Sequence, residues 1–191
     1  MLLKRGVETR LCDAEQEIAR LTSRLRSQSN RSAGVTSKKI GVQELDEKID
    51  LEGFGAELAF CKLCNTYPDF SIFVRSTATD LGDVWLPDGR NVDVKHTKYP
   101  NGRLITPTWK TAEVSLYALM TGIFPRYIFR GVLPRERLMR EENICDLANT
   151  GKLSYGVRQE ELLDLEFERR VYELEEGKPH GLLFVPMKSA G

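Results

Sequence analysis

Residues 80–97 read Asp-Leu-Gly-Asp-Val-Trp-Leu-Pro-Asp-Gly-Arg-Asn-Val-Asp-Val-Lys-His-Thr, and this stretch predicts a β-hairpin around which the rest of the chain is organised. Two short runs rich in β-branched and aromatic residues, 84–86 and 92–94, flank the turn sequence Pro87-Asp88-Gly89. Proline presets φ at the first turn position, aspartate suits the second, and glycine accepts the left-handed conformation that closes a type I turn with a bulge. We therefore predict a hairpin with a three-residue loop.

The loop fixes the register of the two strands. With Leu86 paired to Arg90, Asp83 falls directly opposite Asp93. Side chains alternate between the two faces of a strand, so one face of the hairpin is apolar and the other is polar. The apolar face consists of Val84, Leu86, Val92 and Val94. The polar face consists of Asp83, Trp85, Asn91, Asp93 and Lys95.

Two opposed carboxylates make this polar face a candidate metal site. Directly opposed residues have Cβ atoms about 4.5–5.5 Å apart, and like charges at that distance destabilise the pair. Unless something neutralises them, Asp83 and Asp93 repel each other or share a proton. A divalent cation held by oxygen ligands removes the conflict, and Mg²⁺ is the usual ion where the substrate carries phosphate. The alternative is a solvated hairpin face whose acids are merely exposed.

The composition predicts a globular protein without a membrane-spanning segment. Hydrophobic residues make up 41% and charged residues 29% of the 191-residue chain. The sequence has neither an apolar run of 18 residues nor a signal-peptide core at its N-terminus, so we expect a cytoplasmic protein and no membrane partner. The four cysteines are too few for a disulfide scaffold and fit a reducing compartment.

Charge is balanced overall but uneven along the chain. Lys and Arg number 28, as do Asp and Glu, which excludes a polycation that coats any nucleic acid. Residues 1–39 nevertheless carry nine basic against four acidic residues. This basic arm is compatible with phosphate contacts, and equally with a solvated helix face.

Three segments follow from the pattern of apolar and polar residues. Residues 1–26 predict an amphipathic helix, residues 27–39 a flexible polar linker, and residues 40–191 the main domain. The helix has apolar residues at the spacing of a short coiled coil, namely Val7, Leu11, Ala14, Ile18, Leu21 and Leu25. It either forms a homodimer or packs on its own domain.

The remaining elements surround the hairpin. A helix is expected over 42–65, where Gly53 and Gly55 interrupt the pattern and Glu57 is the one acid in an apolar stretch. Further strands are expected over 70–75, 104–105, 114–121, 127–133 and 182–185, of which 114–121 also fits a short helix. Further helices are expected over 135–148 and 159–174.

The chain has an acid on a helix, followed by Asp83 and then by Asp93 and Lys95 on a paired strand. This arrangement resembles the PD-(D/E)xK nuclease superfamily, which includes restriction enzymes, Holliday-junction resolvases and many phage-borne nucleases. Residues 53–97 carry the resemblance, with a looser match to about residue 131. Glu57 matches the helix glutamate of the family, and Asp93 stands where the family has Asp or Glu. The resemblance implies an α/β fold with a mixed β-sheet core flanked by helices, as in restriction endonucleases.

The resemblance also implies the chemistry, which is Mg²⁺- or Mn²⁺-dependent hydrolysis of DNA, with endonuclease preferred over exonuclease. Glu57, Asp83, Asp93 and Lys95 would be catalytic, and the metal would be held by Asp83, Asp93, the carbonyl of Val94 and Glu57. Asp80 is a rival to Asp83. For a phage-encoded member the compartment would be the host cytoplasm.

Other residues carry weaker signals. The polar turn after Lys95 offers phosphate contacts or simply exposed loop side chains, at Lys98, Asn101, Arg103 and Lys110. Cys61 and Cys64 have CxxC spacing without a second pair, so packing is preferred over zinc binding. His96 is expected on the apolar face, and Trp85 either stacks on a base or caps a sheet edge.

Two functions from different classes remain. The first is a Mg²⁺-dependent deoxyribonuclease that acts as a homodimer on DNA. The second is a non-catalytic nucleic-acid-binding or assembly protein that uses a nuclease-like scaffold and oligomerises through the coiled coil.

Overall fold

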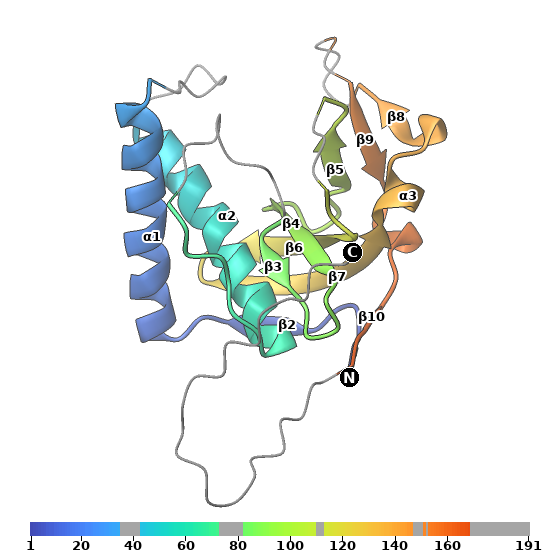
Figure 1. The fold of residues 1–191 in the computed structure, drawn as a ribbon, viewed down its shortest axis with the longest axis horizontal. Helices are drawn as coiled ribbons and strands as arrows, with labels where there is room; N and C mark the ends of the chain where they lie inside the picture. The colour runs from blue at the N-terminus through green and yellow to red at the C-terminus, as the bar shows by residue number, and fades with distance from the viewer. Residues whose placement is uncertain (35–42, 73–81, 110–112, 147–150, 152, 169–191) are drawn as a thin grey trace, which may run out of the picture.

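A mixed five-stranded β-sheet forms the centre of the protein (Figure 1). The computed structural model describes residues 1–34, 43–72, 82–109, 113–146, 151 and 153–168, and for 43–46 the backbone alone. The strand order is β2-β7-β6-β4-β3, with bounds β2 Glu8–Arg10, β3 Val84–Trp85, β4 Asn91–Thr97, β6 Leu116–Ile123 and β7 Arg126–Pro134. Strands β4 and β6 run parallel and the other neighbours antiparallel, so the expected mixed α/β sheet is confirmed.

Helix α2 (Gln43–Cys64) covers one face of this sheet, and α1 (Asp13–Ser32) lies side by side with α2 (Figure 1). The helix expected over 42–65 is therefore confirmed. Phe54, Ala56 and Phe60 of α2 are buried together with Val92 and Val94 of β4 in one apolar core. The face of the hairpin that was expected to be apolar thus packs against α2.

A smaller sheet covers the other face of the central sheet. Its strand order is β5-β9-β8, with bounds β5 Leu104–Pro107, β8 Ile144–Cys145 and β9 Ser154–Val157, and the short helix α3 (Arg135–Leu138) lies beside it (Figure 1). A second apolar core, which includes Leu104, Tyr117, Leu119 and Val157, fills the space between the two sheets. Strand β4 is therefore buried on both faces.

The central hairpin has the predicted turn and register. The N–H of Leu86 donates to the carbonyl of Arg90 at 2.8 Å, and Gly89 has a φ of 90°. Val84 pairs with Val92, as the three-residue loop requires. The ladder ends at that pair, so the expected pairing of Asp83 with Asp93 is not part of it, and Asp83 lies in the bend immediately before β3.

The N-terminal segment belongs to the same fold and is not a separate appendage. Helix α1 begins at Asp13, while β1 (Leu2–Leu3) pairs with β10 (Leu165–Glu166) and β2 joins the central sheet. The expectation of a helix from residue 1 was wrong because the short strands 2–3 and 8–10 find tertiary partners far along the chain. None of the described helices combines the length and the hydropathy that crossing a bilayer requires.

The prediction of a flexible linker over residues 27–39 is wrong for residues 27–32, because these residues form the last turns of α1. Their side chains are small and polar, and Ser27 and Asn30 are buried. The hydroxyl of Ser27 donates a hydrogen bond to Asp50 of α2, so polar contacts replace the apolar residues whose lack suggested a linker. Residues 35–39 of that expected linker lie outside the described residues.

Of the two helices expected near the C-terminus, the first is confirmed only as α3 (Arg135–Leu138), and the second does not form over the described residues 159–168. After α3 the chain forms a 3₁₀ turn at Glu141–Asn143 and then strand β8, which pairs with β9. Another 3₁₀ turn occupies Gln159–Glu161 and is followed by β10. Pairing with distant strands overrides the local helix propensity of these segments. The strand expected over 182–185 lies outside the described residues, as does the part of 70–75 beyond residue 72, and residues 70–72 are not a strand.

The strands expected over 104–105, 114–121 and 127–133 are confirmed as β5, β6 and β7. Helix α2 runs unbroken through Gly53 and Gly55. A Cβ atom on Gly55 would lie 2.3 Å from the hydroxyl of Tyr127 and 2.9 Å from the ring of Phe124. Gly55 therefore permits the close approach of α2 to β7.

Candidate functional site

Asp83 is held at the start of the hairpin by the backbone on either side of it. Gly82 has a φ of 88°, and a Cβ at that position would lie 2.9 Å from the carbonyl oxygen of Val92, so glycine suits this bend. The N–H of Asp83 donates to the same carbonyl at 2.8 Å. Its Oδ2 accepts a 2.7 Å hydrogen bond from the N–H of Val94, which directs the carboxylate toward β4.

Asp93 lies in the middle of the sheet and is 1% exposed. The interpretation of the hairpin face as solvated is therefore wrong for this residue. The ammonium of Lys95, two residues further along the same face of β4, lies 2.5 Å from Oδ1 of Asp93. The same ammonium is 5.9 Å from the ring centre of Tyr117, which is the register partner of Asp93 in β6.

Glu57 enters the site from α2. Its Oε2 accepts a 3.0 Å hydrogen bond from the guanidinium of Arg26 in α1, and the two side chains are 13% and 23% exposed. Arg26 also lies 4.6 Å from the ring centre of Phe54 and donates to the carbonyl of Asp69. The helix pair thus presents an ion pair to the carboxylates of the hairpin.

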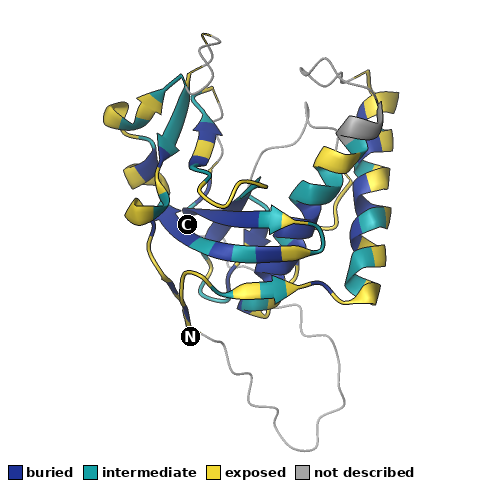
Figure 2. Cartoon of the chain, turned by 180° about the vertical axis from the view of Figure 1, so that it is seen from behind, coloured by how far each residue is buried: buried dark blue, intermediate teal, exposed yellow. Residues whose placement is uncertain are grey.

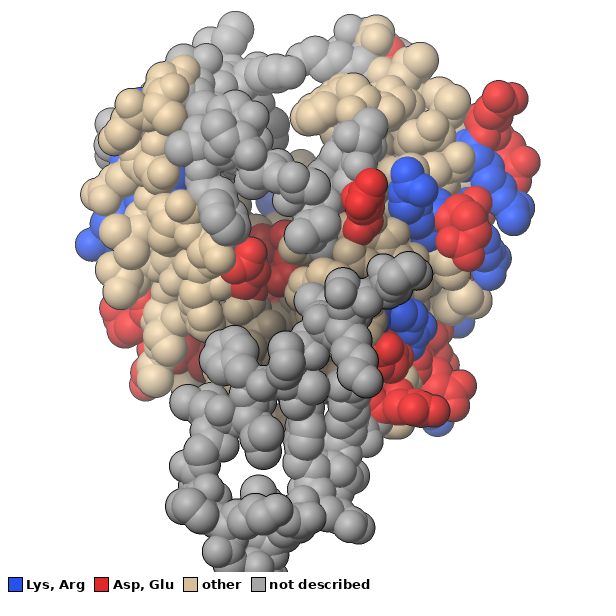
Figure 3. Space-filling view, in the orientation of Figure 1, with Lys and Arg blue, Asp and Glu red and all other residues tan. Residues whose placement is uncertain are grey.

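The charges of the three carboxyl groups act on one another. Burial raises the pKa of Asp83 well above its ordinary value, and the negative charges of Glu57 and Asp93 raise it further. Burial likewise raises the pKa of Glu57, against the opposing effect of Arg26, and Asp93 adds to the increase. Figure 3 shows acidic side chains recessed between the helix pair and the second sheet. Desolvated carboxyls that interact in this way are typical of functional sites.

The cluster offers oxygen ligands of the kind that Mg²⁺ prefers. Mg²⁺ is usually bound through one or two carboxylates, with water and substrate phosphate completing its shell. Asp83 and Asp93 supply two such carboxylates on neighbouring strand segments. In the part of the chain that the structure describes, no three His, Cys, Asp or Glu side chains converge as a ready metal site. The available ligands therefore fit an ion that is bound through two protein carboxylates and water better than an ion that is coordinated by protein atoms alone.

Two cations of this region were not found from the sequence. Arg26 was assigned to a coiled-coil helix, and its partner Glu57 is 31 residues away, so no local spacing signals the pair. Arg130 donates to the hydroxyl of Thr121 at 2.7 Å, and Thr121 is the register partner of Thr97, two residues beyond Lys95. Arg130 lies at the register shift between β6 and β7, between Phe129 and Gly131, which pair with Met120 and Leu119; sequence periodicity does not reveal this irregularity.

The expected nucleic-acid contacts follow β4 directly. Lys98 and Asn101 are exposed and Arg103 is half-buried. The ammonium of Lys98 lies 5.3 Å from the ring centre of Tyr99. Lys110 and the rival acid Asp80 lie outside the described residues. Trp85 is 50% exposed on the edge strand β3, a position that suits either stacking on a base or capping the sheet.

The side chains of Cys61, Cys64 and His96, which were weaker candidates for function, pack against other residues of the fold. Cys61 and Cys64 are buried in the core on α2, and burial raises the pKa of both thiols. His96 lies edge-on to Tyr127, and its Nε2 is 2.9 Å from the carbonyl oxygen of Gly122. These contacts agree with the expectation that the three side chains serve packing.

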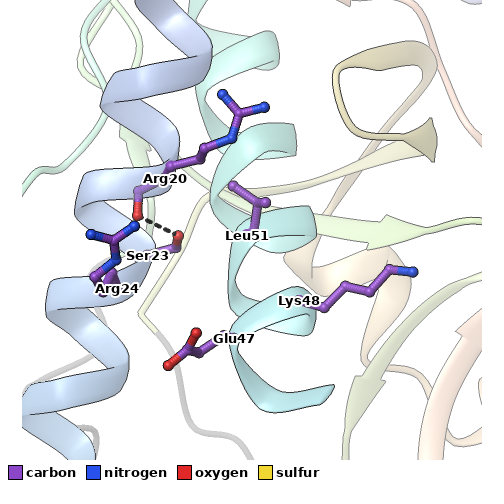
Figure 4. A pocket seen from close by; sticks show the side chains of 6 residues that line it. All are labelled: Arg20, Ser23, Arg24, Glu47, Lys48 and Leu51. Atoms are coloured by element: carbon purple, nitrogen blue, oxygen red, sulfur yellow. Dashed lines mark hydrogen bonds between the residues drawn. The ribbon is translucent and has the colours of Figure 1, made fainter. Parts of the chain in front are cut away.

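A separate cavity of about 180 Å³ lies between α1 and α2, away from the carboxylate cluster. Figure 4 shows its lining, which consists of Arg20, Ser23, Arg24, Glu47, Lys48 and Leu51. Arg20 also lies 5.1 Å from the ring centre of Phe124, and Glu47 pairs with Arg31 at 3.1 Å. These contacts join the two helices to each other and to the β6–β7 turn.

The fold and the site together define a mixed α/β protein with a recessed cluster of carboxylates beside a lysine. A family model described as a family of unknown function, DUF5843, matches residues 5–164, and the chain belongs to this family. The match includes all four residues of the cluster, Glu57, Asp83, Asp93 and Lys95. No curated protein and no solved structure matches the chain.

Proposed function

We propose that this protein is a Mg²⁺-dependent nuclease that hydrolyses DNA phosphodiester bonds at Asp83, Asp93 and Lys95, with Glu57 in support. The observation that carries the proposal is the burial of like-charged carboxyls beside a single lysine. Burial and mutual repulsion raise the pKa of Asp83 and Glu57 in the absence of a cation. Such an arrangement costs stability, and a divalent cation with a phosphate substrate would relieve that cost.

The topology supports the resemblance to PD-(D/E)xK nucleases. The chain carries an acid on α2, an Asp immediately before the first hairpin strand and Asp-x-Lys on the second strand. The second strand, β4, runs parallel to β6 in the centre of a mixed sheet with helices on one face. The restriction-endonuclease-like fold is the finer assignment that we propose for this α/β architecture.

Asp83 and Asp93 would hold the ion, with the carbonyl of Val94 as the further oxygen ligand that we propose. Glu57, which does not converge with both aspartates among the described residues, would act on the site through its charge. When bound, Mg²⁺ or Mn²⁺ would polarise a phosphoryl oxygen and lower the pKa of a coordinated water. The hydrogen bond from the Val94 N–H orients the Asp83 carboxylate for this role. Arg26 orients Glu57 in the same way from α1.

Lys95 has a different role. Its ammonium neutralises Asp93 at 2.5 Å, and its side chain is 22% exposed, so it can reach both the carboxylate and an incoming phosphate. A phosphate placed beside Asp93 would bring its oxygens within reach of this ammonium. Lys95 would then stabilise the negative charge that develops on the phosphate and orient the attacking water.

DNA would approach along the exposed side of the cluster. The side chains of Lys98, Asn101 and Arg103 would contact the sugar-phosphate backbone, which positions the duplex without reading its sequence. Arg130, on the same side of the sheet as Lys95, adds a further cation for such contacts. We propose an endonuclease because nothing in this role requires a free DNA end.

The test is incubation of the protein with supercoiled, linear, single-stranded and branched DNA in Mg²⁺, in Mn²⁺ and in EDTA. Cleavage of at least one substrate with either ion, and none in EDTA, is expected. Asp93→Asn should reduce cleavage by at least about 100-fold. Asp88→Asn, which changes an aspartate of the same hairpin that pairs with Arg90 in the turn, is the matched control and should retain activity.

An absence of cleavage of every substrate with both ions would overturn the proposal. DNA binding without cleavage, unaffected by Asp93→Asn, would favour the non-catalytic scaffold instead.

A further inference from the structure

Helix α1 buries small and polar residues and exposes large apolar ones. Its buried residues face α2 and are Ala19, Thr22, Ser23, Ser27 and Asn30. On the other side Ile18, Leu21 and Leu25 are 44%, 56% and 41% exposed. Figure 2 shows this outer side of α1 coloured as exposed. The helix therefore packs on its own domain with one face, and its apolar stripe stays exposed in the part of the chain that the structure describes.

The stripe has the spacing of a coiled-coil seam. Ala14, Ile18, Leu21 and Leu25 are separated by four, three and four residues, which places them in one row along the helix. Single exposed apolar residues are common on protein surfaces, whereas a continuous row at seam spacing marks an interaction surface. We call these four residues the α1 stripe.

One flank of the α1 stripe carries a negative charge near its N-terminal end and a positive charge near its C-terminal end. Glu17 flanks the N-terminal half and Arg24 the C-terminal half, and both are exposed. The other flank includes Thr22, which is buried against α2, so a partner helix would meet the flank with Glu17 and Arg24. The exposed Arg24 side chain also borders the cavity between α1 and α2. Glu17 pairs with Arg20 within the helix at 2.7 Å, an exposed contact that is easily exchanged.

This charge pattern fits a second copy of the same helix in antiparallel orientation. When Ala14 lies opposite the partner's Leu25, and Ile18 opposite the partner's Leu21, Glu17 meets the partner's Arg24. The twofold axis creates the same pair a second time. A parallel pairing offers Glu17 no basic partner, and an antiparallel shift by one heptad places Arg24 against the partner's Arg24.

We propose that the protein forms a homodimer through the α1 stripe, with the two helices antiparallel and two Glu17–Arg24 pairs across the axis. The α1 stripe faces away from α2, the helix that carries Glu57, so the dimer leaves the carboxylate cluster open. The inference is independent of the proposed nuclease activity because no stripe residue contacts that cluster.

Sedimentation equilibrium of the full chain, from low to about 100 μM protein, tests the proposal. The wild-type protein should dimerise, and Leu21→Gln should weaken the dimer beyond detection while retaining the far-ultraviolet circular dichroism and melting temperature of the monomer. Glu17→Arg alone and Arg24→Glu alone should each raise the dimer dissociation constant about tenfold, because each replaces two attractive pairs by two repulsive ones.

The double variant Glu17→Arg/Arg24→Glu should restore the wild-type dissociation constant, because the antiparallel axis again joins opposite charges. A monomeric wild-type protein at all concentrations would overturn the proposal. So would dimers that persist in Leu21→Gln, or a double variant that is as weak as the single ones.

Discussion

The ammonium of Lys95 lies 2.5 Å from Oδ1 of Asp93, whose side chain is 2% exposed. Asp93 is nearly closed to solvent, so its charge depends on the ammonium of Lys95. Removing one partner of a buried pair leaves an uncompensated charge, which typically costs several kcal/mol. The first prediction concerns this dependence.

Lys95→Met should destabilise the metal-free protein by about 3 kcal/mol, because Asp93 loses its counter-charge. Mg²⁺ should recover part of that loss, since the ion supplies positive charge to the same carboxylate. Urea unfolding in EDTA and in Mg²⁺ measures both effects. Lys98→Met is the control, because Lys98 is exposed and its loss should cost less than about 0.5 kcal/mol. Equal stability of Lys95→Met and wild type in EDTA would contradict the prediction.

Asp83→Asn should stabilise the metal-free protein at neutral and alkaline pH. The raised pKa of Asp83 means that the folded state holds its proton more tightly than the unfolded chain does. The wild-type protein therefore loses stability as the pH rises from about 4, the ordinary pKa of an aspartate, through the raised pKa of the folded state. Asparagine removes this loss and can still accept the hydrogen bond of Val94.

Thermal unfolding of the wild type and of Asp83→Asn in EDTA at pH 4 and pH 8 checks this prediction. The melting temperature of the variant should exceed that of the wild type at pH 8 and approach it at pH 4, with each kcal/mol worth about 2–4 °C. If the melting temperature of Asp83→Asn minus that of the wild type were lower at pH 8 than at pH 4, the raised pKa of Asp83 would be contradicted.

Arg26→Gln should destabilise the protein by about 2 kcal/mol because Glu57 keeps a desolvated charge without its partner. Glu57→Gln in the same chain should recover most of this loss. A double-mutant cycle by chemical unfolding measures the coupling between the two residues. Additive effects of the two substitutions would mean that the ion pair contributes nothing to stability.

Gly55→Ala and Gly53→Ala should have opposite effects on stability, although both glycines lie in α2. A Cβ at Gly55 collides with the hydroxyl of Tyr127 at 2.3 Å, so the substitution should cost about 1–3 kcal/mol. Gly53 has no atom within 4 Å of such a Cβ, so alanine there should add about 0.5–1 kcal/mol through helix propensity. Melting temperatures that change in the same direction would contradict the packing of α2 on Tyr127.

The hairpin could be predicted because its turn chemistry is local. Pro87, Asp88 and Gly89 determine the loop, the loop determines the register, and the alternation of side chains then places Asp93 and Lys95 on one face. Glu57 could be singled out as the one acid in an apolar stretch of helix. Each of these signals is local, because it depends only on residues that are close to it in the sequence.

The orientation of α1 could not be predicted, because the helix buries Ser23 and Ser27 and exposes Leu21. The contact that decides this orientation is polar and comes from α2, through Ser27 and Asp50. Strand β8 was missed for a similar reason, since its pairing partner β9 lies across a chain reversal and overrides helix propensity. Contacts of this kind, with residues far along the chain, do not produce a periodic pattern of apolar residues in the sequence.

The central claim is that Asp83 and Asp93 share one divalent cation. Isothermal titration of Mn²⁺ into the wild type, Asp83→Asn, Asp93→Asn and Asp88→Asn tests it most directly. The account predicts one ion bound by the wild type and by Asp88→Asn, with affinity that rises with pH as the carboxyls lose their protons, and at least about tenfold weaker binding in each of the other two variants. Equal Mn²⁺ affinity in all four proteins, or no binding by the wild type, would contradict it.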